Sequence, residues 1–247
     1  TLTWNFAWDA YVAPPSGTKV PPPAYASTVG TTGLNTLMRG TGGPRAYQMQ
    51  FSAAALSGLP IGAQITELRF RLDSTATTAF PIATVNWTEY DVTLARASNS
   101  VAGMSSTFAN NMAAPVLVKS GALSVPANQF PAGGNPNAFA SLIVFDTPYI
   151  DQGGDLVMLF RHSGSDSTNS PFLDALNAST PGYGTDFRAV SAPTFAGTIG
   201  AAASVTIPQI VFKYIPQQTI SFSGTDAIIA GMGGPPGGGY RLLVSTN

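Results

Sequence analysis

The sequence predicts an all-β protein, a jelly-roll-like antiparallel β-sandwich with long loops and a C-terminal strand extension. Short runs rich in β-branched and aromatic residues recur along its 247 residues, separated by Pro, Gly, Asn and Asp. This pattern is typical of antiparallel strands joined by turns. No long stretch has the periodicity of an amphipathic helix, and the 20 prolines and 26 glycines also disfavour long helices.

The composition excludes several classes of protein. Only 9% of the residues are charged and the net charge is −1, so the chain lacks the basic surplus that phosphate neutralisation requires, and we expect no nucleic-acid partner. A hydrophobic content of 44% excludes disorder. The polar surface must consist mainly of Ser, Thr, Asn and Gln. Because charge normally keeps proteins apart, such a surface favours association between copies of the chain.

The chain contains no cysteine, which excludes disulfides, thiol catalysis and Cys-ligated zinc. It has no run of the roughly 18 apolar residues that would cross a bilayer. It begins directly in a strand-like alternation, which we interpret as a mature N-terminus from which a signal peptide was removed. We therefore expect an extracellular or cell-surface protein, with a cloned fragment as the alternative.

The first half of the chain supplies several strands in order. Residues 1–12 alternate aromatic and polar residues, and residues 14–46 form a long surface loop with one short strand. The clearest strand is Ile65–Asp73, in which Ile65, Leu68, Phe70 and Leu72 alternate with Glu67, Arg69, Arg71 and Asp73. Further strands are predicted at Tyr47–Phe51, Val85–Ala95 and Pro115–Lys119, with a helical turn at 52–59 and a short helix within 101–111.

The stretch Ala140–Arg161 is predicted to be the centre of the fold. Two nearly continuous apolar runs, 142–145 and 156–160, flank a cluster of turn residues. Continuous rather than alternating apolar runs indicate strands that are covered on both faces. We expect a hairpin in the middle of a sheet, followed by an irregular segment at 163–184 and final strands at Phe187–Val190 and Ile207–Tyr214.

The character of the chain changes after Pro216, so we predict a sandwich domain over 1–216 and an extension over 217–247. The extension combines a short strand at Thr219–Phe222, the glycine-rich linker 231–239 and an apolar strand at 240–245. It is either part of a second module or a donor strand for another subunit. The predicted interface residues are Tyr240, Arg241, Leu242, Leu243, Val244 and Ser245.

Two parts of the sequence resemble known proteins. The segments 47–73, 106–112 and 143–161 resemble a β-sandwich domain of secreted and surface proteins from environmental bacteria, many of which carry a sorting tail of the PEP-CTERM kind. The resemblance extends over about residues 45–214 and rests on spacing and turn residues. It implies export and little about chemistry. Residues 224–247 resemble the opening of a second β-sandwich module in the same kind of protein.

No catalytic set is apparent, and we expect neither an enzyme nor a cofactor. His162 is the only histidine, and although Asp166 and several serines are near it in sequence, a Gly-x-Ser-x-Gly motif is absent. A metal site built on several histidines is excluded, because the chain has no second histidine. Glu67 and Glu89 are the only glutamates, and both are predicted to face solvent rather than one cleft.

Two ligand hypotheses also follow from the sequence. Asp146, Asp151 and Asp155 cluster around the turn of the central hairpin and are candidate Ca²⁺ ligands, although Asp is also an ordinary turn residue. Trp4, Trp8 and Trp87 are candidates for a sugar-stacking platform, although aromatic residues on alternating strands more often face the core.

These observations favour a non-enzymatic exported structural protein. A leftover apolar strand is an edge that invites pairing, and adding it to the sheet of a neighbouring subunit would join subunits head-to-tail into a filament or surface layer. The partner would be another copy of the chain. The alternative function is a carbohydrate-binding or adhesive surface module, whose partner would be a polysaccharide.

Overall fold

The structure, a computed structural model, describes residues 16–214, 217–223 and 226–232, and this part is almost entirely β. Its two short 3₁₀ helices are η1 (Pro23–Tyr25) and η2 (Phe108–Asn111). The strands are β1 (Ser16–Lys19), β2 (Thr32–Leu34), β3 (Arg45–Phe51), β4 (Gln64–Phe70), β5 (Val85–Trp87), β6 (Tyr90–Ala97), β7 (Met112–Lys119), β8 (Leu123–Val125), β9 (Ala140–Ile150), β10 (Leu156–His162), β11 (Leu173–Leu176), β12 (Phe187–Ala192), β13 (Ala201–Ala203), β14 (Val205–Thr206), β15 (Gln209–Lys213), β16 (Gln217–Ser223) and β17 (Asp226–Met232).

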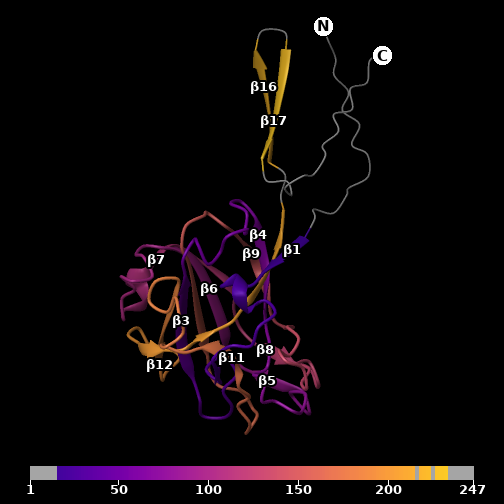
Figure 1. Cartoon of the computed structure of the whole chain (residues 1–247), viewed down its shortest axis with the longest axis vertical. Coiled ribbons are helices and arrows are strands. Elements are labelled where there is room, and N and C mark those ends of the chain that lie inside the picture. Colours follow the sequence, from indigo (N-terminus) through magenta and orange to yellow (C-terminus); the bar gives the residue numbers. More distant parts are fainter. Residues whose placement is uncertain (1–15, 215–216, 224–225, 233–247) are drawn as a thin grey trace.

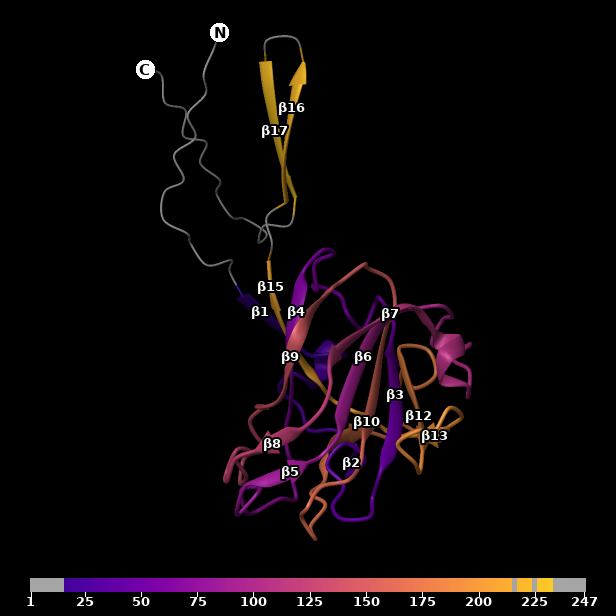
Figure 2. The same ribbon diagram turned by 180° about the vertical axis from the view of Figure 1, so that it is seen from behind.

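Two antiparallel sheets form the sandwich (Figures 1 and 2). One has the order β1-β15-β4-β9 and the other the order β13-β12-β3-β10-β6-β7. The strand pairs are nested in the sequence: β6 with β7 is innermost, followed outward by β4 with β9, β3 with β10, and β1 with β15. This is the pairing of one long hairpin folded over on itself, which is the jelly-roll topology, with β12 and β13 added beside β3.

The predicted central hairpin is wrong in its pairing. β9 and β10 do not pair with each other but lie in different sheets, so the turn at 151–155 crosses from one sheet to the other. β10 is central, between β3 and β6, as its continuous apolar run predicts. β9 pairs only with β4, and Val144 is 61% exposed. An apolar run therefore did not distinguish a central strand from an edge strand.

Other elements differ from their predicted positions. The segment 14–46 contains two short strands, β1 and β2, together with the fully buried Leu37 and Met38. The segment 163–184 contains β11, all four residues of which are buried. The predicted strand Val85–Ala95 is split into β5 and β6, and β5 pairs with β8 in a separate two-stranded sheet. The short helix within 101–111 is present as η2.

A β-bulge explains the spacing in the clearest predicted strand. Ile65 and Leu68 are three residues apart, yet both are fully buried. In the pairing of β4 with β15, Val211 lies opposite Glu67 and Phe212 lies opposite Ile65, so Thr66 is an extra residue of β4. The extra residue at this bulge restores the inward direction of Leu68.

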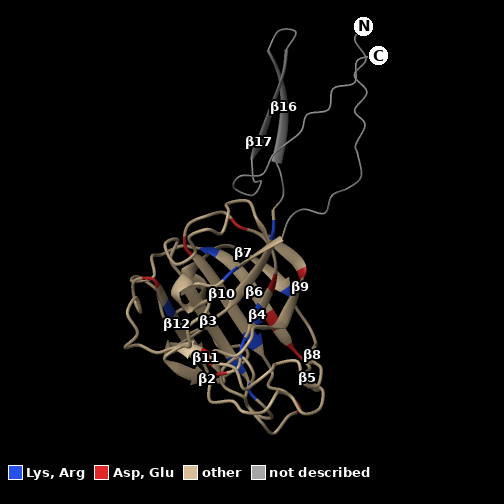
Figure 3. Cartoon of the chain, turned by 45° about the vertical axis from the view of Figure 1, so that its right-hand side comes forward, with Lys and Arg blue, Asp and Glu red and all other residues tan. Residues whose placement is uncertain are grey.

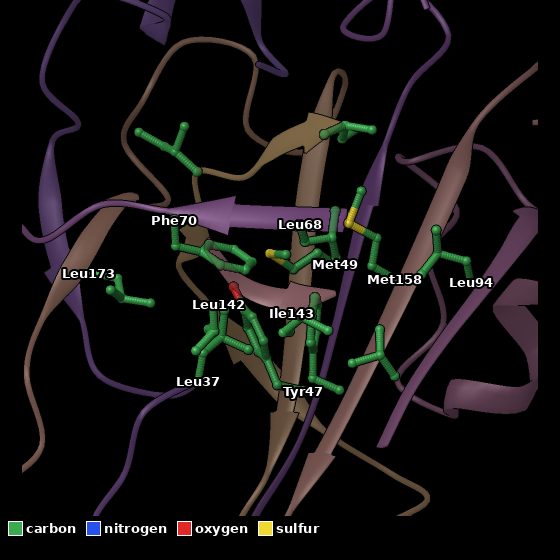
Figure 4. Close-up of a cluster of buried hydrophobic side chains, with 14 of the residues drawn as sticks. Leu37, Tyr47, Met49, Leu68, Phe70, Leu94, Leu142, Ile143, Met158 and Leu173 are labelled. Carbon is green, nitrogen blue, oxygen red and sulfur yellow. The ribbon is translucent and has the colours of Figure 1, made fainter. Parts of the chain in front are cut away.

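The core lies between the two sheets, where Leu68, Phe70 and Ile143 from one sheet meet Tyr47 and Met158 from the other (Figure 4). The outer face of the six-stranded sheet is also covered, because Phe108 of η2 packs with Leu159 and Val190 in a second buried cluster. The Gln48 side chain is completely buried there; its amide nitrogen donates to the Phe108 carbonyl at 3.1 Å, and its amide oxygen accepts from Asn111 at 2.7 Å. β3 and β10 are therefore buried on both faces.

The register defines two ends of the sandwich. Ser16 lies opposite Lys213, and Lys213 opposite Gln64, so β1 begins where β15 ends. We call this end the tail pole, because residues 1–15 and 217–232 connect to it. β4 and β10 both run from the tail pole to the opposite end, where the segments 71–85 and 163–172 follow them.

β16 and β17 form a two-stranded sheet that contains no other strand of the described part (Figure 1). The predicted strand Thr219–Phe222 is confirmed within β16. Its partner is an unpredicted strand, β17, which includes Gly231 and Met232 from the expected linker. No helix among the described residues is long and apolar enough to cross a membrane.

Candidate functional site

An open groove lies at the end of the sandwich opposite the tail pole. We call it the polar-end groove, where "polar" refers to its place at one pole of the molecule and not to its chemistry. One wall is the segment 72–85, which follows β4, and the other is the segment 166–172, which follows β10. Its volume is about 760 Å³, which is within the range of small-ligand sites. The groove is formed by loops on a rigid sandwich, the usual position of binding sites in β-proteins.

The first wall is fixed by hydrogen bonds at its base. Asp73 Oδ1 accepts from the Thr75 amide at 3.0 Å and from the Thr75 hydroxyl at 2.5 Å, which makes a side-chain-closed turn. The Asp73 amide donates to the Phe172 carbonyl at 2.9 Å and so joins the two walls. Farther along, Phe80 and Phe130 exchange backbone hydrogen bonds in an isolated bridge. The wall is thus held at both ends.

The second wall is fixed by Asp166. Its Oδ1 accepts from the Asn86 amide at 2.8 Å, and its Oδ2 accepts from the Asn86 side chain at 3.0 Å. These hydrogen bonds lower the pKa of the Asp166 carboxyl, so it is ionised at neutral pH. The loop at Gly40 also supports this wall: a Cβ at Gly40 would lie 2.3 Å from the Ser167 carbonyl oxygen, so only glycine permits the approach.

A buried ion pair lies under the groove. Arg71 and Asp174 are 1% and 2% exposed, and Arg71 Nε donates to Asp174 Oδ2 at 2.7 Å. Arg71 Nη2 also donates to the carbonyls of Tyr25 at 3.1 Å and Thr28 at 2.5 Å, and Asp174 Oδ1 accepts from the Gly30 amide at 2.7 Å. Because Arg71 precedes the first wall and Asp174 follows the second, the pair positions both.

The exposed surface of the groove is apolar and weakly acidic. Ile82 is 78% exposed and Phe172 is 55% exposed, so each wall presents a large apolar side chain to solvent. The groove residues include two carboxylates, Asp73 and Asp166, and no Lys or Arg. Charged residues are sparse over the sandwich as a whole (Figure 3). The arrangement suits an extended ligand with apolar side chains and little negative charge.

The structure contradicts the sugar-stacking prediction for Trp87. This residue is 1% exposed and packs edge-to-face against Tyr90, with ring centroids 5.9 Å apart. Its face cannot contact a sugar ring. Trp4 and Trp8 lie outside the described residues.

The three candidate calcium ligands have different local roles. Asp146 accepts from Ser120 and Lys119, while Asp155 accepts from the amide of Ala53 and the side chain of Gln50. Asp151 is buried, and burial raises the pKa of its carboxyl to about 6. Within residues 16–214, no group of three carboxylate or histidine side chains has the geometry of a metal site. The carboxylates are used as turn and loop contacts.

His162 is a structural residue. It is fully buried and stacks on Tyr90, with Nε2 2.7 Å from the Thr36 carbonyl oxygen and Nδ1 accepting from the Gly164 amide at 3.1 Å. Both ring nitrogens are therefore satisfied in the neutral imidazole. Burial lowers the pKa of His162 to about 4. Asp166 is bonded to Asn86 instead, so the two residues do not form a catalytic pair.

The predicted interface residues 240–245 lie outside the described part of the chain. Sequence reasoning missed the polar-end groove, because its walls were interpreted as a plain loop and an irregular segment. The available signal was the short run Phe172–Leu176, apolar except for Asp174, which predicts a buried strand next to a surface loop. No family model matches the chain, and no curated protein sequence matches it significantly.

Proposed function

We propose that this protein is a non-enzymatic, exported structural subunit that assembles head-to-tail into an extracellular filament or surface layer by strand donation. The donor is the C-terminal segment, which includes the apolar strand predicted at 240–245. The observation that carries the proposal is the β16–β17 hairpin, which contains no third strand in the described part of the chain.

A two-stranded hairpin is at best marginally stable alone in water. In its register Ile220 lies opposite Ile229, and Phe222 opposite Ala227, so apolar residues are paired along it. A hairpin of this composition gains stability when it packs against another surface or when another strand joins it. Within the described part of the chain no strand of the sandwich pairs with this hairpin, so another subunit is the natural source of that surface.

The sandwich protects its long edges, which restricts where subunits can join. β7 carries Pro115 and a residue with positive φ, Ala114 at 47°. β9 carries Pro148 beside a wide irregularity in its pairing with β4. Proline and bulges prevent non-specific pairing at sheet edges. Assembly through the ends of the sandwich, rather than sideways through β7 or β9, agrees with this pattern.

The test is truncation after Pro216 followed by electron microscopy of the purified protein. The core clusters lie within residues 20–212, so the shortened chain retains every buried contact described for the sandwich. We expect the full chain to form filaments or sheets and the truncated chain to remain monomeric. Assemblies that persist without residues 217–247 would exclude strand donation by this segment.

The second candidate is a carbohydrate-binding module, and the exposed Phe172 between hydroxyl-rich loops is the observation that favours it. An aromatic face can stack on a sugar ring. Retention on insoluble polysaccharide measures this directly, with Phe172→Ala as the variant. Equal retention of the two proteins would remove this candidate.

A further inference from the structure

We propose that the polar-end groove is the receiving site for residues 240–245 of a neighbouring copy of this chain. The inference rests on the proposed function, because it names the surface on which the donated segment docks. Three properties of the described residues support it: the opposite positions of the donor connection and the groove, the chemistry of the groove, and the backbone amides of its first wall.

The first property is that the donor segment and the groove are at opposite ends of the molecule. The C-terminal segment leaves the sandwich through β15 at the tail pole, and the groove lies at the opposite end. A donor at one end and an acceptor at the other make a heterologous contact, which propagates in a line unless the geometry closes a ring. Residues 233–247 can reach roughly 50 Å when extended at about 3.3 Å per residue, so a neighbour is within range.

The second property is the match of chemistry. The segment 233–247 contains one charged side chain, Arg241, among the apolar residues Tyr240, Leu242, Leu243 and Val244. The groove offers exposed apolar side chains at Ile82 and Phe172 and carboxylates at Asp73 and Asp166, with no Lys or Arg. The N-terminal segment 1–15 carries Asp9 instead and lacks a basic residue. Charge complementarity therefore favours the C-terminal segment as the occupant.

The third property is the backbone of the first wall. The amides of Ile82, Ala83 and Thr84 donate to no backbone carbonyl in the described part of the chain. An extended segment lying along this wall would accept from alternate amides of this run, because successive amides of an extended backbone point to opposite sides. Its alternate side chains would contact Ile82 and Phe172. This is recognition by strand addition, in which backbone hydrogen bonds supply affinity and side-chain contacts supply specificity.

The experiment compares four single variants of the full chain by sedimentation and electron microscopy. Ile82→Asp blocks the groove, and Leu242→Asp blocks the donor. Ile61→Asp is the matched control, because Ile61 is 72% exposed against 78% for Ile82 but lies near the tail pole, beside Gly153. Val144→Asp tests the smaller groove of about 280 Å³ beside β9. Circular dichroism confirms that each variant is folded, which we expect because the altered sandwich residues are exposed.

We expect Ile82→Asp and Leu242→Asp each to abolish assembly, and Ile61→Asp and Val144→Asp to leave it unchanged. Mixing the two blocked variants gives the decisive result. The Ile82→Asp subunit keeps its donor and the Leu242→Asp subunit keeps its groove, so together they form one interface and stop at a species of twice the 25.5 kDa subunit mass.

The outcomes separate this inference from the proposed function. If Leu242→Asp abolishes assembly while Ile82→Asp does not, donation stands and the polar-end groove is not the acceptor. Loss of assembly in Val144→Asp alone would move the acceptor to β9. If Ile82→Asp changes only the retention on polysaccharide, the groove is a glycan site. If neither Leu242→Asp nor truncation affects assembly, the proposed function itself fails.

Discussion

Two ion pairs near the end of β4 show how differently the same residue types behave in this molecule. Arg69 and Glu67 pair on the outer surface, with side chains 38% and 13% exposed and Arg69 Nε 3.0 Å from Glu67 Oε1. Arg71, two residues farther on, pairs with Asp174 in a site where both side chains are at most 2% exposed. The first pair can exchange its partner for water, and the second cannot.

This difference in burial indicates which polar groups contribute most to the stability of the fold. Removing one member of a buried pair leaves an uncompensated charge away from water, whereas a pair that solvent partly reaches is screened and contributes less. The buried pair also connects three parts of the chain that are distant in sequence: the segment 25–30, the end of β4 and β11. A Cβ at Gly30 would lie 2.4 Å from Asp174 Oδ1, so glycine is required for this contact.

The largest effect is expected for Arg71→Met. This variant leaves Asp174 buried without its counter-ion, and we expect it to lower the free energy of unfolding by about 3–5 kcal/mol. Denaturant titration followed by tryptophan fluorescence measures the change. An effect below about 1 kcal/mol would mean that water reaches the Asp174 carboxylate.

A double variant sharpens this comparison. Arg71→Met with Asp174→Leu removes both charges, and replacing a whole buried pair by apolar residues is often close to neutral. We expect the double variant to be more stable than Arg71→Met alone, measured in the same titration. A strictly additive loss would show that the individual hydrogen bonds of each residue matter more than their pairing.

A smaller, pH-dependent effect is expected from His162. Its pKa is about 4 in the fold against 6.5 in the unfolded chain, so the unfolded state binds the proton first. Stability is therefore lost as the pH falls from about 6.5 to 4, by roughly 2–3 kcal/mol. Melting temperatures of the wild type and His162→Gln across this range measure the effect, and we expect the variant to lose less stability on acidification.

Asp151 provides the matched control, because its contribution to stability changes with pH in the opposite direction to that of His162. Burial raises the pKa of this carboxyl to about 6, above that of an unfolded Asp. Ionisation of the Asp151 carboxyl destabilises the fold, so its protonation at lower pH raises the free energy of unfolding. We expect Asp151→Asn to make the acid-induced loss steeper. An unchanged slope would show that solvent reaches this carboxylate in the folded protein.

The smallest effect is expected for Glu67→Gln. Burial alone would raise the pKa of Glu67, but hydrogen bonds from Arg69 and Ser141 and the charge of Arg69 outweigh it and lower the pKa. The Glu67–Arg69 pair therefore stabilises the fold at neutral pH. This stabilisation is lost as the pH falls through the lowered pKa of Glu67. We expect a change of at most about 1 kcal/mol that decreases further in high salt, measured by the same denaturant titration.

The sequence predicted the fold class because strand composition and turn residues are local signals. It failed where the outcome depends on distant partners. The alternation in Ile65–Asp73 places Arg71 with Glu67 and Arg69, yet Arg71 is buried, because the segment 25–30 and β11 cover it. Likewise, the apolar runs of β9 and β10 are similar, and only the sheet pairing distinguishes them.

The candidate site was less predictable than the fold. Its walls, 72–85 and 166–172, are distant in sequence and are brought together by the Leu72–Leu173 bridge. Trp87 illustrates the converse: its type indicated binding, while the pairing of β5 with β8 puts it inside. The strands at residues 1–12 and 240–245 stay predictions.

The position of β15 between β1 and β4 also determines how the molecule would bear a mechanical load. In a head-to-tail chain, tension would enter through the segment after β4 and leave through the end of β15. These neighbours are antiparallel, so the pull would slide one along the other. Interstrand hydrogen bonds lie perpendicular to the strands, so sliding loads them together. A pull separating Ser16 from Lys213 would instead open the β1–β15 ladder one bond at a time. Such a subunit would be stiff along the filament axis and weak at the end of the ladder where Ser16 lies opposite Lys213.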